Sequence, residues 1–460
     1  MHPLAGMTII LGAFLLLWIA LALFRKLRNP NPEILRKLMH VGMGLVTLLL
    51  PSLFDRAWPV LLLASFCALA LAAAKFWPPL GAVIGGVDRA SRGDLYFPIS
   101  VAILFIAANH TTTSLVHGRA ILFCIPILIL TFADAVAALV GISYGAHRYT
   151  GIESQKSAEG SLAFFTIAFL STHIPLLLLT NDQQMAREKV LLISLTIGFL
   201  VMLLEGIAWR GLDNLLVPLG AFILLNKYIW LTPRDLSIRF IVAFGWVLLV
   251  LMWRRLSSLN AAALLGAALV GYIATALGGW IWVIPPMLLF VSYNSIWPRI
   301  EHDRLHTHTM HGVISTNTPG LMWLLAGNTL KVEFPRQFFW PYALTYASHL
   351  AIIGFMRLRH VYPDAKPQTH FLRALILSWL VLFIPATIGF VVWYWPQDRL
   401  IAAAQLALAL IGISISLGLF HRTQPHLADM PTDLGRWWRQ AIDATAGSLF
   451  TLILFYFERA

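Results

Sequence analysis

Three acidic residues near the ends of long apolar runs have the chemistry to handle phosphate. Asp134 lies late in the apolar run Ala120–Ile142, Glu205 lies near the end of another, and Asp213 opens the run after that. Carboxylates suit Mg²⁺, a hard cation that binds carboxylate and phosphate oxygens. An ionisable group in an apolar span is costly and indicates function. The sequence therefore predicts a magnesium site formed by Asp134, Glu205 and Asp213.

Each acid also has a structural explanation. Asp134 could pair with a neighbouring arginine or hydroxyl group. Asp213 and Asn214 are residue types that favour the N-terminal cap of a helix, and this role is compatible with a functional one.

A basic turn precedes the next apolar run. It reads Lys-Ser-Ala-Glu-Gly-Ser, and it contains Lys156, Ser157, Glu159 and Gly160. A lysine beside the backbone N–H groups of a helix N-terminus forms an anion site, so these residues are candidates for binding phosphate oxygens. The alternative is an ordinary interfacial loop in which the glutamate is a helix cap.

Small residues follow Asp134 at helical spacing. Ala138, Gly141 and Gly145 recur every three or four residues, so they share one helix face with Asp134. Such a face allows another helix or a ligand to approach closely. Gly141 and Gly145 are therefore candidate residues of the binding site.

The elements that position these residues are predicted to be membrane helices. The chain has 460 residues, of which 59% are hydrophobic and 12% are charged, whereas soluble domains have about 25% charged residues. Apolar runs approach the ~20 residues that cross a bilayer, and backbone groups in lipid must be satisfied by helices. We predict an all-α polytopic bundle of about 14–16 transmembrane helices. Examples of the runs are Thr8–Phe24, Ala57–Ala74, Leu162–Thr180 and Val190–Ala208.

The composition also excludes some classes of protein. Cys67 and Cys124 are the only cysteines and both lie in apolar runs, so neither a disulfide framework nor a thiolate metal site is expected. The net charge of +12 comes from Lys and Arg spread over many short loops. Membrane lipids and the positive-inside rule explain this distribution better than nucleic acid does.

The positions of the basic residues also predict how the helices are oriented in the membrane. The basic segment from Arg25 to Lys37 is expected in the cytoplasm, which leaves the N-terminus outside. Counting helices forward then brings the loops near 75–92, 143–160 and 209–214 to the same side. The candidate residues are thus predicted to meet at the cytoplasmic face of an inner or plasma membrane.

Two further polar segments open apolar runs on that side. Arg36, Lys37 and His40 begin one run, and Asp94 lies at the start of another. All four are candidate substrate-binding or nucleotide-binding residues. The alternatives are that the basic residues only mark topology and that His40 is a polar group satisfied inside the bundle.

Taken in order, these segments resemble the polyprenol kinase family. This family includes phytol kinase, dolichol kinase and CTP-dependent diacylglycerol kinase, and it is related to the phosphatidate cytidylyltransferases. The resemblance implies CTP as phosphoryl donor, Mg²⁺, and a membrane-dissolved lipid alcohol as acceptor. It also points to Asp134, Lys156, Glu159, Glu205 and Asp213 as the functional polar set, with Asn214 and His40 beside them. The segments that carry it are RKLMHVG, GDLYFPIS, FADAVAALVGISYG, KSAEGS and E-x₇-DNLLVPL, over residues 36–220.

The usual nucleotide-binding motifs are absent. The chain contains neither the phosphate-loop motif nor Gly-x-Gly-x-x-Gly. A nucleotide site must therefore be built differently, and the helix-terminal lysine and glycines fit that requirement.

A basic break near residue 256 predicts two domains, 1–256 and 257–460. The second resembles the membrane family that contains phytyl-phosphate kinase, which implies a second phosphorylation step. The acidic pattern expected there is replaced by Leu344–His349, which has no acid. The loop containing His302, Asp303, His306, His308 and His311 could bind a metal, but it lacks zinc-site spacing and is better explained as an interfacial, pH-sensitive loop.

Two other functions compete with a kinase. A cytidylyltransferase would join a lipid phosphate to the α-phosphorus of CTP and release pyrophosphate. A lipid transporter or flippase would also have many helices with scattered intramembrane polar groups.

Overall fold

The structure is a computed structural model. It describes residues 2–74, 93–113, 115–150, 155–255, 257–298, 308–329, 335–394, 399–424 and 434–453. These residues form two compact units, Met1–Phe244 and Gly245–Ala460, which are described separately. The division falls within the helix that spans residues 233–253, twelve residues before the predicted boundary at 256. Whether the units are separate functional domains stays a prediction.

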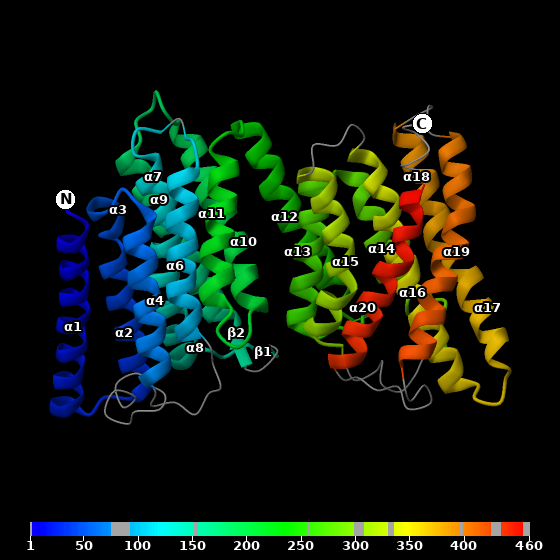
Figure 1. Ribbon diagram of the computed structural model, residues 1–460, viewed down its shortest axis with the longest axis horizontal. Helices are drawn as coiled ribbons and strands as arrows, with labels where there is room; N and C mark the ends of the chain where they lie inside the picture. The colour runs from blue at the N-terminus through cyan, green and yellow to red at the C-terminus, as the bar shows by residue number, and fades with distance from the viewer. Residues whose placement is uncertain are drawn as a thin grey trace. The chain divides into compact units, whose positions relative to one another are not determined.

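Unit 1 is a helical bundle with one small hairpin at one end (Figure 1). Its elements are α1 (Pro3–Arg28), α2 (Pro32–Thr47), α3 (Leu50–Leu53), α4 (Ala57–Ala74), α6 (Gly93–His110), α7 (Gly118–Leu128), η1 (Ile129–Ala133), α8 (Asp134–Tyr144), β1 (Arg148–Thr150), β2 (Gln155–Ser157), α9 (Ala158–Leu179), α10 (Arg187–Ile207), α11 (Asp213–Tyr228) and most of α12 (Pro233–Trp253).

Unit 2 contains only helices among its described residues. They are α13 (Ala261–Gly278), η2 (Trp280–Val283), α14 (Ile284–Ser292), α15 (Met310–Thr329), η4 (Pro335–Phe338), α16 (Phe339–Val361), α17 (Pro367–Ser378), η5 (Trp379–Phe383), α18 (Ile384–Tyr394), α19 (Arg399–Thr423), α20 (Leu434–Ser448) and η6 (Leu449–Leu452).

The prediction of an all-α multi-pass membrane protein is confirmed. Within the described residues, nine helices are long and apolar enough to cross a membrane, and three shorter apolar helices accompany them. Their outward surfaces carry large apolar side chains such as Leu16, Leu69 and Ile241, as lipid-facing surfaces do. The predicted total of about 14–16 spans remains a prediction.

The long span Gly118–Tyr144 is interrupted by a π-helical turn. The turn η1 joins α7 to α8 and ends directly before Asp134. A π turn shifts the hydrogen-bond register of a helix and is common at functional sites. Here the Leu130 carbonyl, which lies within the turn, accepts a hydrogen bond from His40 at 3.0 Å.

The centre of unit 1 is formed by α9 and its neighbours α8 and α10. Phe164 on α9 and Ile197 on α10 are fully buried. Between α8 and the β2–α9 corner the backbones come close, because both sides carry glycine. A side-chain carbon on Gly160 would lie 3.1 Å from the Ala137 carbonyl oxygen, and one on Gly141 would lie 3.3 Å from Ser157 Oγ. The predicted face of small residues on α8 therefore packs closely against the start of α9.

The β1–β2 hairpin precedes this close contact. The strands pair antiparallel, with Tyr149 opposite Lys156. Ser157 ends β2 and caps α9, since its hydroxyl accepts a hydrogen bond from the Gly160 N–H at 3.1 Å. The hairpin thus sets the direction in which the Lys156 side chain points.

Unit 2 is organised around α16, almost all of whose side chains are buried. Trp340, Tyr342 and Tyr346 are among its largest buried residues. The segment Leu344–His349, where the sequence lacks the expected acids, lies wholly inside this helix. Of the predicted histidine loop, His302, Asp303 and His306 lie outside the described residues.

We expect Gly145→Ala to destabilise unit 1. An added carbon would lie 2.2 Å from the Gly141 carbonyl oxygen and 2.9 Å from Ser157 Oγ, and overpacking of this kind typically costs about 1–3 kcal/mol. Thermal unfolding of the purified protein measures the change. Gly12→Ala is the control, because nothing lies within 4 Å of the added carbon there. Equal melting temperatures for the two variants would contradict the close contact.

Candidate active site

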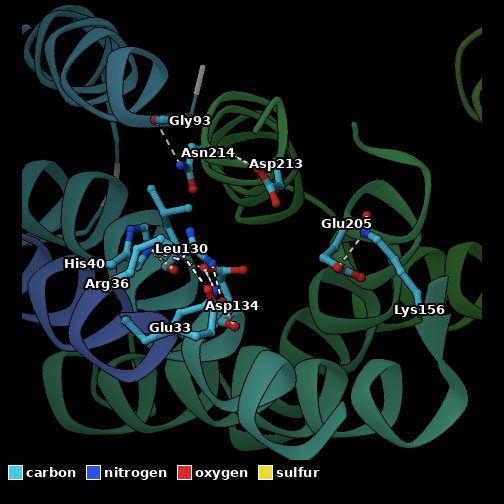
Figure 2. A network of polar contacts seen from close by, with 11 residues as sticks. Glu33, Arg36, His40, Gly93, Leu130, Asp134, Lys156, Glu205, Asp213 and Asn214 are labelled. Carbon is cyan, nitrogen blue, oxygen red and sulfur yellow. Dashed lines mark hydrogen bonds and ion pairs between the residues drawn. The ribbon is translucent and has the colours of Figure 1, made fainter. Parts of the chain in front are cut away.

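The candidate acids and lysines lie at one end of unit 1. They come from four parts of the chain, namely α2, the η1–α8 junction, the hairpin, and the α10–α11 connection (Figure 2). In Figure 1 the α1–α2 connection and the β1–β2 hairpin both lie at the lower end of this unit. The geometry thus brings together residues that are up to 176 positions apart in the sequence, from Lys37 to Asp213.

The first pair in the site is Lys37 with Asp134. Lys37 Nζ lies 2.6 Å from Asp134 Oδ2 and donates a second hydrogen bond to the Asp134 carbonyl oxygen at 3.3 Å. Lys37 is only 5% exposed, so this ion pair is shielded from solvent. It joins α2 to the start of α8.

His40 lies one turn further along α2 and reinforces this junction. Its Nε2 donates to the Leu130 carbonyl and lies 3.7 Å from Asp134 Oδ2. Its ring also packs edge-on against Phe97. His40 is therefore satisfied inside the bundle and is also adjacent to the candidate acid.

The second pair is Lys156 with Glu205. Lys156 Nζ lies 2.6 Å from Glu205 Oε1 and also donates to the Glu205 backbone carbonyl. Burial opposes the charged form of Lys156, but the Glu205 carboxylate outweighs it and raises the pKa of the lysine. The pair connects β2 to the last turn of α10 and keeps the ammonium group charged.

Asp213 lies between the two pairs. Figure 2 shows its carboxylate on the first turn of α11, with Asp134 on one side and Glu205 and Lys156 on the other. It interacts electrostatically with Asp134, Lys156 and Lys37. Among the residues that the structure describes, Asp213 forms no ion pair, unlike the other two candidate acids.

Asp213 and Asn214 also have local structural roles. Asp213 Oδ1 accepts a hydrogen bond from the Asn214 N–H at 2.9 Å, which satisfies a terminal amide of α11. Asn214 Nδ2 donates to the Gly93 carbonyl at 3.0 Å and so ties α11 to the start of α6. The side chain of Asp94, also a candidate, lies outside the described residues.

Two candidates form hydrogen bonds beside this network, and one of them, Arg36, also interacts electrostatically with Asp134. Arg36 forms a two-point ion pair with Glu33 on its own helix, with distances of 2.6 and 3.1 Å. Glu159 accepts hydrogen bonds from the His147 N–H and ring, which anchors the hairpin to α9.

At the predicted anion site, the start of α9, two backbone N–H groups already donate hydrogen bonds within the protein. The Ala158 N–H donates to the His147 carbonyl, and the Gly160 N–H donates to Ser157. Gly141, Gly145, Ser157 and Gly160 form the packed corner beside Lys156. Their observed role is to bring the helices close together.

Sequence reasoning missed how the lysines are paired. Lys37 was a candidate, but its contact with Asp134 spans 97 positions and has no local sequence pattern. The available signal was a lysine close to a histidine, His40, on the buried side of α2. The hydrogen bonds accepted by the Leu130 and Gly93 carbonyls could not be predicted from the side chains of these residues.

The donor set fits magnesium held jointly with a phosphate ligand. Within the described residues no three His, Cys, Asp or Glu side chains are grouped as a preformed metal site. Mg²⁺ usually takes one or two carboxylates and completes its shell with water and substrate phosphates. Asp213, with Asp134 and Glu205 on either side, matches that requirement.

We expect the Lys156–Glu205 pair to behave as a coupled unit. Lys156→Met or Glu205→Gln alone leaves one buried group without its partner, which costs about 3–5 kcal/mol for a well-buried pair. The double variant should lose at least about 1 kcal/mol less than the sum of the two single losses, because neighbouring partners are not additive. Unfolding free energies of the three variants in detergent measure this coupling.

The exposed pair Arg187–Asp182, at 2.8 Å, is the matched control. Exposed pairs contribute only about 0–1 kcal/mol, so Arg187→Ala should change stability little. If the double variant lost as much unfolding free energy as the two single variants together, the Lys156 and Glu205 side chains would not interact as described.

Comparison with known proteins supports the family resemblance. No protein-family profile matches the chain, and no solved structure matches it. The chain is 30% identical over 211 residues to the phytol kinase of Synechocystis sp., an alignment that covers 45% of this chain and 86% of that enzyme. Since the similarity extends over nearly the whole length of the relative, the chain belongs to the polyprenol kinase family, as a relative of phytol kinase.

Proposed function

We propose that the protein is a CTP-dependent kinase that phosphorylates a membrane-dissolved isoprenoid alcohol. The observation that carries the proposal is the convergence of two lysine–carboxylate pairs and Asp213 at one end of unit 1. The similarity to phytol kinase supports an isoprenoid alcohol as the acceptor. CTP and Mg²⁺ follow from the family resemblance and from the donor set.

Phosphoryl transfer mainly requires positioning of the reactants and neutralisation of charge. Lys37 and Lys156 provide two ammonium groups whose present partners are carboxylates. Phosphate oxygens of the nucleotide are equally good acceptors, so they can replace those partners when the nucleotide binds. The carboxylates of Asp134, Glu205 and Asp213 would hold magnesium, which neutralises phosphate charge when bound.

The alcohol is expected to enter from the bilayer. Its apolar chain can lie between or against the lipid-facing helices, while its hydroxyl group reaches the polar end of unit 1. In the reaction the hydroxyl oxygen attacks the γ-phosphorus of CTP, CDP leaves, and the hydroxyl proton passes to a carboxylate. Asp213 is suited to accept this proton, because it forms no ion pair with a described residue.

A kinase assay tests the proposal. The purified protein with CTP and phytol should release CDP and phytyl monophosphate, identified by mass. Geranylgeraniol, longer polyprenols, dolichol and diacylglycerol define the acceptor range, and ATP and GTP define the donor range. Release of pyrophosphate from a lipid phosphate would instead identify a cytidylyltransferase. A diphosphate product would support a second phosphorylation step, and monophosphate alone would count against it.

We expect Asp213→Asn to lower kcat at least about 100-fold, the scale of a lost acid–base contribution. The substitution keeps the shape of the side chain and removes no ion pair formed with a described residue, so the melting temperature should change little. Asp182→Asn, at the exposed turn before α10, is the control and should retain full activity. Activity of Asp213→Asn close to that of the parent protein would reject the role of this carboxylate.

The proposed site faces the cytoplasm. Labelling of single cysteines tests this, starting from a variant without Cys67 and Cys124. His147→Cys lies beside the hairpin, where the side chain is 85% exposed. Gln183→Cys lies in the connection after α9, about 33 Å along that 22-residue helix. A membrane-impermeant maleimide should label position 147 from the cytoplasmic side and position 183 from the other side, and the reverse pattern would overturn the orientation.

A further inference from the structure

The interior of unit 2 contains a histidine–glutamine pair with unused hydrogen-bonding atoms. His349 lies in the middle of α16 and Gln440 lies in α20, and both residues are fully buried. His349 Nδ1 lies 3.0 Å from Gln440 Nε2, and this contact joins the two helices. Among the residues that the structure describes, no group forms a hydrogen bond with His349 Nε2 or Gln440 Oε1. Because buried polar atoms are nearly always hydrogen-bonded, a bound molecule is expected to complete the pair.

The unused atoms of the pair are one donor and one acceptor. If Gln440 Nε2 donates to His349 Nδ1, the other ring nitrogen of the neutral histidine carries the proton and donates, while the amide oxygen accepts. Reversing the amide exchanges these roles, so a donor and an acceptor remain in either arrangement. A carboxylate can only accept and an ammonium group can only donate, whereas a hydroxyl group does both. A hydroxyl group therefore complements the pair.

The helix α20 directs its polar side chains into the bundle. Arg436, Gln440 and Asp443 are buried, whereas Trp438 and Ile442 are more than half exposed. Positions 436, 440 and 443 are three or four residues apart, so they share one face of the helix. Polar groups on the inner face of a membrane helix usually have a functional role. Gln440 thus belongs to a polar face inside unit 2.

A cavity lies beside the pair. Residues of α12, α13, α14, α15, α16 and α20 line it. Tyr346 and Ile353 line it from α16, and His349 lies one helical turn from each of them. Trp437 lines it from α20, three residues before Gln440. The pair therefore lies on the same helix faces that bound the cavity.

The cavity walls suit a hydrocarbon chain. Most of the lining is apolar, and Val270, Met287 and Phe290 are among its residues. Small-molecule sites typically combine such walls with a few polar groups that fix the orientation of the ligand. Arg357 and Arg436 also line the cavity, but both have interaction partners within the protein. The arginines therefore do not require a charged ligand.

We propose that unit 2 binds a long-chain lipid alcohol, with its hydroxyl group between His349 and Gln440 and its apolar chain in the adjacent cavity. The hydroxyl group accepts a hydrogen bond from one side chain of the pair and donates one to the other. Such an alcohol is either an isoprenoid alcohol or diacylglycerol, which share the recognised chemistry. The proposal does not rest on the proposed function of unit 1, because every residue that it uses belongs to unit 2.

Photo-crosslinking of the intact protein in the absence of nucleotide tests the proposal. The probe is a phytol analogue with a diazirine near the end of its chain, added to the protein in phosphatidylcholine nanodiscs. Crosslinks should map to α13 or α14, near Val270 and Met287. Unlabelled phytol should displace the probe at least about tenfold more effectively than phytyl methyl ether, which keeps the chain but cannot donate a hydrogen bond.

A double variant removes the pair without leaving a buried group unpaired. His349→Phe combined with Gln440→Leu replaces both partners by apolar side chains, a change that proteins tolerate better than the loss of one partner. In this variant phytol and its methyl ether should compete equally. Ser416→Ala is the matched control, because Ser416 donates to Ser348 at 3.0 Å between the neighbouring helices α19 and α16. It should keep the preference of the parent protein for phytol.

A second variant tests the place of the chain. Ala267 lines the cavity, so Ala267→Phe should fill it and lower labelling of α13 and α14 at least about tenfold. Labelling of this variant equal to that of the parent protein would contradict the proposed place of the chain. Melting temperatures identify any variant that fails to fold, and competition on the parent protein then still decides the question.

Competition also identifies the ligand. Stronger displacement by phytol than by diacylglycerol supports an isoprenoid alcohol, and the opposite order supports diacylglycerol. Equal displacement by phytol and its methyl ether in the parent protein would overturn the proposal, because only the chain would then be recognised and water would complete the pair. Crosslinks confined to unit 1 would also overturn it.

Discussion

The high cost of an isolated charge among membrane helices organises the candidate site. A charged group in an apolar span persists only when a partner and hydrogen bonds stabilise it. Lys37 and Asp134 meet this requirement together, and so do Lys156 and Glu205. Each pair connects elements that are far apart in the sequence. The same contacts that keep the charges stable therefore also determine which helix ends lie together.

Several local features serve these pairs. The π turn before Asp134 presents the Leu130 carbonyl to His40, which keeps α2 against the start of α8. The hairpin and the glycine-rich corner direct Lys156 toward α10. Asn214 holds α11 against the start of α6. As a result, Asp213 lies between two neutralised pairs, and its carboxylate is the one best placed to meet an incoming cation or proton.

Unit 2 satisfies buried polar groups in a different way. Arg357 donates to a backbone carbonyl and to an amide oxygen, and His349 bonds to Gln440 inside the bundle. The lining of its cavity has guanidinium groups but, among the described residues, no carboxylate. The two units thus stabilise these buried polar groups with different partners.

The sequence by itself determined the all-helical membrane fold, the approximate ranges of several helices of unit 1 and the identity of the candidate acids. Long apolar runs and isolated charges within them are local signals, because lipid imposes the same demands on every segment. Tertiary structure decided which charges pair, since Lys37 and Asp134 meet across 97 positions without any periodic pattern. It also decided that the first amides of α9 already have partners within the protein. Contacts made by backbone groups, such as those of Leu130 and Gly93, could not be predicted because every residue carries the same carbonyl.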